Sequence, residues 1–266
     1  MTHALDLFKL HGKVALVTGG GRGLGYFAAE ALAEAGADVA ICGRDVHGNL
    51  DEAHQRLKRL GRNSIAIKCD VSKEDKVVQM AVTMKEYYGK CDILVNNAGI
   101  MDVARLEEMS LDSCTDMLNT NLAGTFLCCR EIGKLMLERQ SGSIINFSSE
   151  VSQVGYSFGM AMYAATKSGI IGLTRSLAVE WGKLNIRVNA ILPGNMEEGM
   201  GEALKDKESF AYKMIGDTAL KLTPLNRFGN GDDIKGAIVF LASGASSFIT
   251  GAKIIVDGGI TINSGI

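Results

Sequence analysis

The chain alternates short, continuous apolar runs with longer segments in which apolar residues recur at helical spacing. Short runs that are rich in β-branched residues and end at glycine or polar residues are typical of strands buried on both faces of a parallel sheet. Such runs occupy residues 13–20, 38–43, 64–70, 92–99, 143–149, 186–192 and 252–259. The helical spacing predicts helices near residues 25–37, 49–60, 73–88, 112–139, 160–183 and 231–243.

This regular alternation predicts an α/β protein in which helices cover both faces of the sheet. No linker, repeat or low-complexity block interrupts the pattern between residues 1 and 266. We therefore expect one Rossmann-like, doubly wound domain with a seven-stranded, mostly parallel sheet.

Composition excludes several classes of partner. Charged residues make up 22% of the chain and the net charge is −2, so nothing indicates a surface for nucleic acid. No stretch approaches the roughly 18 apolar residues of a membrane span, so we expect no membrane partner. The six cysteines form no C-x-x-C pair and no targeting segment opens the chain, which favours a cytoplasmic protein.

Histidine is placed unfavourably for hydrolytic or zinc chemistry. All four histidines lie within the first 54 residues. A serine or cysteine nucleophile usually needs a histidine base, and zinc sites need clustered histidine or cysteine ligands. We therefore expect neither a hydrolase triad nor a metal site.

A glycine-rich turn, "TGGGRGLG" at residues 18–25, joins the first predicted strand to the first predicted helix. Glycines at this position permit a tight turn and let backbone N–H groups approach a pyrophosphate at the helix N-terminus. A glycine-rich turn alone often only ends a strand, but its place between strand and helix favours a dinucleotide site.

The second predicted strand ends at Gly43, where NAD-binding proteins commonly carry an acid that binds the ribose 2′-hydroxyl. Arg44 follows directly, and Arg22 lies within the glycine-rich turn. Two guanidinium groups beside a missing carboxylate favour a 2′-phosphate, although Asp45 weakens the pattern. We expect NADP(H) to be preferred over NAD(H).

Tyr163 and Lys167 lie four residues apart in "MYAATKSG", a spacing that places both on one face of a helix. Most such pairs are only neighbours on a helix surface. The spacing alone leaves open whether this pair is such a surface neighbour or a phenol prepared for proton transfer, in which a nearby ammonium would favour the phenolate.

These motifs together resemble the short-chain dehydrogenase/reductase family along essentially the whole chain. The motifs that support this resemblance are the glycine-rich turn, "CDV" at 69–71, "NNAG" at 96–99, "NLAG" at 121–124, "NFSS" ending at Ser149, "YAATK" at 163–167, "PG" at 193–194 and "VDGG" at 256–259.

The resemblance implies a catalytic tetrad of Asn121, Ser149, Tyr163 and Lys167. Tyr163 would be the general acid for ketone reduction and the base for alcohol oxidation, which requires its pKa to fall by ~3 units. Ser149 would bind the substrate oxygen, and Asn121 would link the lysine to a proton-relay water. The cofactor residues implied by the glycine-rich turn and the family motifs are Thr18, Gly19, Arg22, Gly23, Leu24, Gly25, Arg44, Asp70, Val71, Asn97, Ala98, Gly99, Tyr163, Lys167, Pro193, Gly194 and Met196.

Two features depart from the common family pattern. The separation of Ser149 and Tyr163 is 14 residues, one longer than usual, and Glu198 stands about where the family has a threonine that binds the nicotinamide carboxamide. We assign Glu198 no catalytic role. Residues 195–222 are expected to form a substrate lid, with Gly199 and Gly201 permitting hinge motion; an ordinary solvated loop is the alternative.

Among subfamilies, the chain resembles gluconate 5-dehydrogenase and related sugar-acid and polyol dehydrogenases. Such enzymes tend to carry a basic residue soon after "NNAG", whereas this chain has Asp102, with Arg105 three positions later. An acid facing the pocket would repel an anionic substrate, so a neutral polyol or ketose is an alternative substrate to a sugar acid. We expect Val151, Gln153, Tyr156 and Met200 to line the pocket.

Three functions remain open. The leading one is NADP-dependent interconversion of a secondary alcohol and a ketone on a sugar acid or polyol. A 3-oxoacyl thioester reductase would share every catalytic motif, and a non-catalytic NADP-binding sensor or scaffold is a different class. The resemblance also implies a homotetramer, with the helices near 112–139 and 160–183 at one interface and the C-terminal strand at another.

Overall fold

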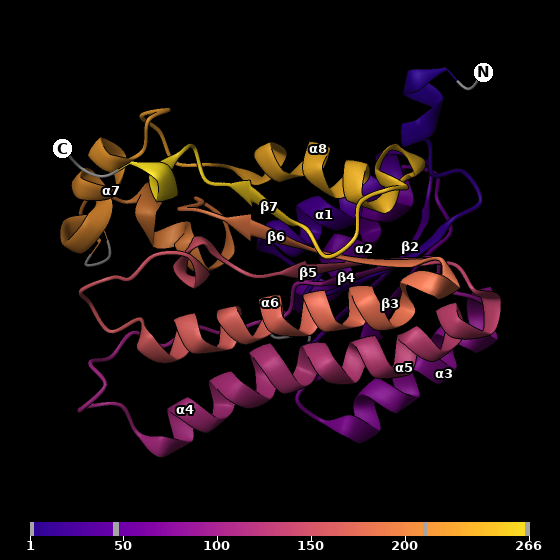
Figure 1. Ribbon diagram of the computed structural model, residues 1–266, viewed down its shortest axis with the longest axis horizontal. Coiled ribbons are helices and arrows are strands. Elements are labelled where there is room, and N and C mark those ends of the chain that lie inside the picture. Colours follow the sequence, from indigo (N-terminus) through magenta and orange to yellow (C-terminus); the bar gives the residue numbers. More distant parts are fainter. Residues whose placement is uncertain (1–2, 45–47, 210–211, 264–266) are drawn as a thin grey trace.

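The computed structural model describes residues 3–44, 48–209 and 212–263, which form a central sheet between two layers of helices (Figure 1). The strands are β1 (Val14–Thr18), β2 (Asp38–Gly43), β3 (Ser64–Lys68), β4 (Ile93–Asn96), β5 (Gly142–Phe147), β6 (Ile186–Pro193) and β7 (Lys253–Val256). Their order is β3-β2-β1-β4-β5-β6-β7, and all neighbours run parallel. The expected doubly wound, seven-stranded sheet is therefore confirmed.

Helices cover both faces because the strands are apolar on both sides. The helices α1 (Gly23–Glu34), α2 (Asn49–Arg59) and α8 (Gly231–Ala242) bury Leu32, Leu57 and Ile238 on one face. On the other face, α3 (Glu74–Tyr88), α5 (Gly124–Arg139) and α6 (Ala161–Trp181) bury Met80, Ile132 and Trp181. None of the helices among the described residues is long and apolar enough to cross a membrane.

The predicted helix over 112–139 is interrupted. Ser110 caps α4 (Leu111–Met117), and a π-helical turn over Leu118–Ala123 then leads into α5. Asn121 lies in this turn, and the Thr125 hydroxyl donates a hydrogen bond to its carbonyl oxygen at 2.7 Å. The π-turn inserts an extra residue into the helical repeat, and such turns are frequent at functional sites.

The segment 195–222 contains short elements that the sequence pattern did not predict. They are a 3₁₀ turn (Gly199–Lys205), a π turn (Tyr212–Gly216) and the helix α7 (Asp217–Leu222). The other short 3₁₀ turns cover Ala4–Phe8, Glu150–Ser152, Gly182–Leu184, Gly244–Ser246 and Ile260–Ile262.

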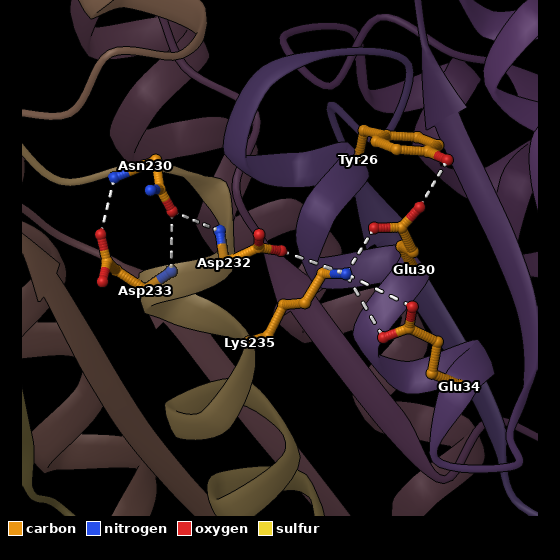
Figure 2. A network of polar contacts seen from close by, with 7 residues as sticks. All are labelled: Tyr26, Glu30, Glu34, Asn230, Asp232, Asp233 and Lys235. Atoms are coloured by element: carbon orange, nitrogen blue, oxygen red, sulfur yellow. Dashed lines mark hydrogen bonds and ion pairs between the residues drawn. The ribbon is translucent and has the colours of Figure 1, made fainter.

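An ion-pair network joins α1 to α8, two helices that are distant in sequence (Figure 2). The Lys235 ammonium lies 2.6 Å from the Glu30 carboxylate, 3.3 Å from Glu34 and 3.4 Å from Asp232. Tyr26 donates a hydrogen bond to Glu30 at 2.8 Å. The start of α8 is fixed by a capping box between Asn230 and Asp233. The network holds the helix that follows the lid segment against the helix that follows the glycine-rich turn.

Candidate active site

A cavity of about 530 Å³ opens at the carboxyl ends of the strands. The order of strands reverses between β1 and β4, and ligands of open α/β sheets bind in the crevice at such a switch point. The cavity is bordered by the glycine-rich turn, by the segments after β4 and β5, and by residues of the lid segment.

The glycine-rich turn packs tightly against the end of β4. The Thr18 hydroxyl accepts hydrogen bonds from the backbone N–H groups of Asn97 and Ala98, both at 3.0 Å. The Asn97 side chain donates to the Thr18 carbonyl at 3.1 Å. A Cβ atom at Gly25 would collide with the Gly19 carbonyl oxygen, so only glycine fits there.

Most of the expected cofactor residues border this cavity. Thr18 and Gly25 lie behind it and hold the turn in shape. Asp70 is fixed by hydrogen bonds from the backbone N–H and the hydroxyl of Ser72, at 3.0 and 2.8 Å. The bordering residues from the expected set are Gly19, Arg22, Gly23, Leu24, Arg44, Asp70, Val71, Asn97, Ala98, Gly99, Tyr163, Lys167, Pro193, Gly194 and Met196.

Arg22 and Arg44 are exposed and border the cavity. Neither guanidinium makes an ion pair with another described residue. The nearest atom to a Cβ at Gly43 would be Leu50 Cδ1, 3.8 Å away, so packing does not require glycine at this position. Asp45 lies outside the described residues.

The segment 195–222 contacts the glycine-rich turn directly. Gly23 and Gly199 both have positive φ angles, of 55° and 67°, and a Cβ at Gly23 would lie 2.8 Å from the Gly199 Cα. Glu198 borders the cavity, and its Oε1 lies 3.5 Å from the Lys205 ammonium. Its Oε2 is buried and has no hydrogen-bond partner among the described residues.

These features fit a nicotinamide dinucleotide. The tight glycine turn at the start of α1 presents backbone N–H groups to a pyrophosphate. The buried Glu198 Oε2 lacks a donor, which the carboxamide of a nicotinamide can supply.

Tyr163 and Lys167 lie one turn apart on α6, where the side chain of Tyr163 is 8% and that of Lys167 is 3% exposed. The Lys167 ammonium lies 5.5 Å from the centre of the Tyr163 ring and donates to the Phe147 carbonyl at 2.9 Å. Burial lowers the pKa of Lys167 to about 8.

The expected fall in the Tyr163 pKa does not arise from the chain itself. Burial raises this pKa, the negative charge of Glu150 raises it further, and the Ser149 hydroxyl only partly opposes both. The expectation overlooked Glu150 and the removal of the phenol from water. In the chain alone, Tyr163 is held in its protonated form.

Asn121 is fully buried and does not border the cavity. Its side chain accepts from the Ile100 backbone N–H at 2.8 Å and donates to the Ile100 carbonyl at 2.9 Å and to the Thr166 hydroxyl at 3.1 Å. A Cβ at Gly99 would lie 3.2 Å from Asn121 Oδ1 and 3.6 Å from Lys167 Nζ. Glycine at position 99 therefore lets the turn after β4 pass close to both side chains.

Glu150 is a site residue that the sequence analysis missed. It borders the cavity, with Oε2 accepting from the Ser149 hydroxyl at 2.7 Å and Oε1 accepting from Tyr156 at 3.2 Å. Burial raises its pKa. A single glutamate after a strand has no periodic pattern, so only its packed position could identify it.

Two expectations for the pocket are wrong. Asp102 does not border the cavity, because its exposed carboxylate binds the hydroxyl of Ser113 instead. Gln153 also lies outside, where its amide oxygen accepts from Lys253 at 2.6 Å. Val151, Tyr156 and Met200 do border the cavity.

Comparison with known proteins places this geometry in context. Residues 19–261 match a family model described as enoyl-(acyl carrier protein) reductase. D-threitol dehydrogenase of Mycolicibacterium smegmatis is 39% identical over 270 residues, covering 98% of this chain and 100% of the relative. The 3-oxoacyl-[acyl-carrier-protein] reductase of Staphylococcus epidermidis is 40% identical over 251 residues, covering 93% and 98%.

A solved structure has the same fold. A gluconate 5-dehydrogenase from Burkholderia cenocepacia in complex with NADP and tartrate is 36% identical, with a TM-score of 0.90 over 98% of this chain and 99% of that chain. Taken together with the doubly wound sheet and the motif order, these similarities show that the chain belongs to the short-chain dehydrogenase/reductase family and is an oxidoreductase acting on CH–OH groups.

Proposed function

We propose that this chain is an NADP(H)-dependent oxidoreductase that interconverts a secondary alcohol and a ketone. The observation that carries the proposal is the meeting of Ser149, Tyr163 and Lys167 at one cavity, which the glycine-rich turn also borders. When bound, the nicotinamide cofactor supplies or accepts the hydride.

Tyr163 is the proposed general acid for ketone reduction. Its raised pKa keeps the phenol protonated, as donation to a carbonyl oxygen requires. Ser149, in the segment after β5, is proposed to bind the same substrate oxygen, for which its hydroxyl proton would turn from Glu150 to that oxygen. In the oxidative direction, the positive charges of Lys167 and of an oxidised nicotinamide oppose the effect of burial on the phenol.

Asn121 is the proposed positioning residue of the tetrad. It clamps Ile100 on both backbone groups and contacts Thr166, whose hydroxyl donates to the Tyr163 carbonyl at 2.8 Å. The clamp thus connects the turn after β4 to the first turn of α6. Lys167 is directed by its hydrogen bond to Phe147 at the end of β5.

The preference for NADP(H) is supported by two exposed arginines that border the cavity. Arg22 and Arg44 offer bidentate donors to a 2′-phosphate, and Gly43 places no carboxylate beside it. The related gluconate 5-dehydrogenase was solved with NADP.

The substrate is proposed to carry no negative charge. Among the described residues that border the cavity, the cationic ones are Arg22, Arg44 and Lys167, and all three belong to the proposed cofactor or catalytic groups. The carboxylate of a sugar acid would therefore find no partner and would face Glu150. Of the two classes suggested by the resemblance, a polyol fits better than a sugar acid.

A 3-oxoacyl thioester reductase is the second candidate. It is favoured by the apolar wall that Met200, Leu204 and Ile215 form in the lid segment, which suits an acyl chain. We propose the lid role of residues 195–222 on the same ground, because these side chains would close over whichever substrate enters.

The assembly and location are further proposals. A homotetramer is supported by exposed apolar side chains on the outer faces of α4, α5 and α6, at Leu111, Phe126 and Val179. A cytoplasmic location is supported by six free cysteines.

The direct test is the initial rate of NADPH and NADH oxidation by purified protein with neutral ketones, an anionic ketone and an acetoacetyl thioester. We expect turnover with NADPH, and we expect Tyr163→Phe to lower kcat by at least about a hundredfold while NADPH binding persists. Unchanged turnover in Tyr163→Phe would refute the proton-transfer role. NADPH binding without any turnover by the wild-type chain would favour the sensor or scaffold.

A further inference from the structure

Glu150 borders the same cavity as Ser149 and Tyr163. Its side chain is 5% exposed and begins the 3₁₀ turn after β5, directly beside Ser149. Both carboxylate oxygens accept hydrogen bonds, and both donors are neutral hydroxyls, those of Ser149 and Tyr156. The group therefore has hydrogen bonds but no neutralising charge.

A buried carboxylate is normally paired with a cation. Among the described residues, no lysine or arginine forms an ion pair with Glu150. Burial above all, and the negative charge of Asp257 in addition, raise the pKa of Glu150, and a cation beside the carboxylate would favour its ionised form. Among the described residues, no positive charge therefore neutralises the Glu150 carboxylate.

Many other residues that border the cavity are apolar. Among them are Val103, Val151, Phe158, Met160, Met200 and Leu204. A polyol would leave several hydroxyl groups facing these side chains without partners, which is unfavourable. An apolar carbon body with one polar group suits the wall better.

We propose that the substrate is a mostly apolar amino ketone, or the corresponding amino alcohol, whose protonated amine binds the Glu150 carboxylate. This inference rests on the proposed function. Because Glu150 adjoins Ser149, which binds the reacting oxygen, the amine and the carbonyl are separated by few bonds in one small molecule. Glu150 is then a residue that determines substrate specificity by charge.

Three cyclic ketones of similar size test the proposal. They are 1-methylpiperidin-3-one, whose amine is protonated in slightly acidic buffer, neutral 3-methylcyclohexanone, and anionic 3-oxocyclohexanecarboxylate. With NADPH, we expect kcat/KM to be at least about tenfold higher for the cation than for the neutral ketone, and lowest for the anion.

Glu150→Gln removes the charge but keeps an oxygen that can accept from Ser149 or Tyr156. We expect it to lower kcat/KM for the cationic ketone about tenfold more than for the neutral one. The control is Asp102→Asn, which removes an exposed acid that does not border the cavity, and we expect it to leave the ratio of the two substrates unchanged.

Equal losses for all three ketones in Glu150→Gln would overturn the proposal and leave Glu150 as a residue that only positions Ser149. In that case, NADPH-dependent turnover of 3-methylcyclohexanone would still uphold the proposed function. If no ketone is turned over, calorimetric titration of the NADP-bound protein with 1-methylpiperidin-3-ol tests whether Glu150 binds the protonated amine. Binding that weakens in Glu150→Gln supports the inference, and no binding, or equal binding, refutes it.

Discussion

At the scale of single residues, Lys167 is held in an unfavourable position for an ammonium group. It is almost fully buried, and its described hydrogen bond to the Phe147 carbonyl does not replace the lost water, so its pKa falls to about 8. A group of this kind is retained for chemistry and lowers the stability of the chain without cofactor.

We expect Lys167→Met to abolish turnover yet stabilise the cofactor-free chain at pH 7, by up to ~3 kcal/mol. Between about pH 8 and ~10.4, the unfolded chain keeps the Lys167 proton that the folded chain has lost, so wild-type stability rises with pH. The difference in the free energy of unfolding between Lys167→Met and the wild-type chain should therefore shrink as the pH rises over that range. Urea unfolding at both ends of the range measures it.

The control is Lys85→Met on α3, where the lysine is exposed and pairs with Glu138 at 3.1 Å. We expect a change in the free energy of unfolding within about 0.5 kcal/mol at pH 7. A loss of stability in Lys167→Met at neutral pH would contradict our account of the buried ammonium.

Gly43 offers the second residue-scale prediction. An aspartate there has room beside Leu50 and would lie where a ribose 2′-hydroxyl binds but a 2′-phosphate is repelled. We expect Gly43→Asp to lower kcat/KM for NADPH at least about tenfold and to raise that for NADH. Equal losses for both cofactors would show that Gly43 does not face the ribose.

At the scale of elements, one lysine balances the negative charge where α1 meets α8. Lys235 is 21% exposed and lies among Glu30, Glu34 and Asp232 (Figure 2). Burial alone would lower the pKa of Lys235, but the carboxylates of Glu30 and Glu34 outweigh burial and raise it. Without the lysine, three carboxylates would repel one another across the helix contact.

We expect Lys235→Met to lower the free energy of unfolding by about 1–2 kcal/mol in low salt and by less in high salt. Because the pKa of Lys235 is raised in the folded chain, its contribution is complete at neutral pH and is lost only above pH ~10.4. Urea midpoints at two salt concentrations test this. A salt-independent loss would point to altered packing instead.

The sheet and its covering helices could be predicted because buried parallel strands read as β-branched runs between amphipathic segments. The π-turn at Leu118–Ala123 could not, since its residues continue the helical pattern and only the Asn121 contacts with Ile100 and Thr166 explain the extra residue. The short elements within residues 195–222 pack around a small apolar cluster of Leu204, Tyr212, Ala219 and Phe228, which the periodicity of the sequence does not reveal.

The candidate site could likewise be predicted only in part. The sequence points to Tyr163, Lys167 and the glycine-rich turn as candidates, because residues that share one helix face or one tight turn have a fixed spacing. Glu150, the orientation of Asp102 and the raised pKa of Tyr163 depend on contacts between segments that sequence spacing does not encode.

At the scale of the whole molecule, the outer faces of α4, α5 and α6 leave apolar side chains in water. We expect light scattering to give a mass about four times the 28.3 kDa of the chain. Phe126→Asp combined with Val179→Asp should yield smaller species, because both residues lie on the proposed interface helices.

The control for this test is Val82→Asp, at an exposed apolar position on α3, outside the proposed interfaces. It should leave the mass unchanged. A monomer in the wild-type chain, or dissociation by Val82→Asp alone, would contradict the proposed assembly.

The close approach of Gly23 and Gly199 has a kinetic consequence. The glycine-rich turn and the lid segment meet so tightly there that a methyl group on Gly23 would have no room. Under the proposed function, a dinucleotide bound at this turn would have to separate the two segments to enter or to leave. We therefore expect the opening of this contact, rather than hydride transfer, to limit how soon the chain can begin another cycle.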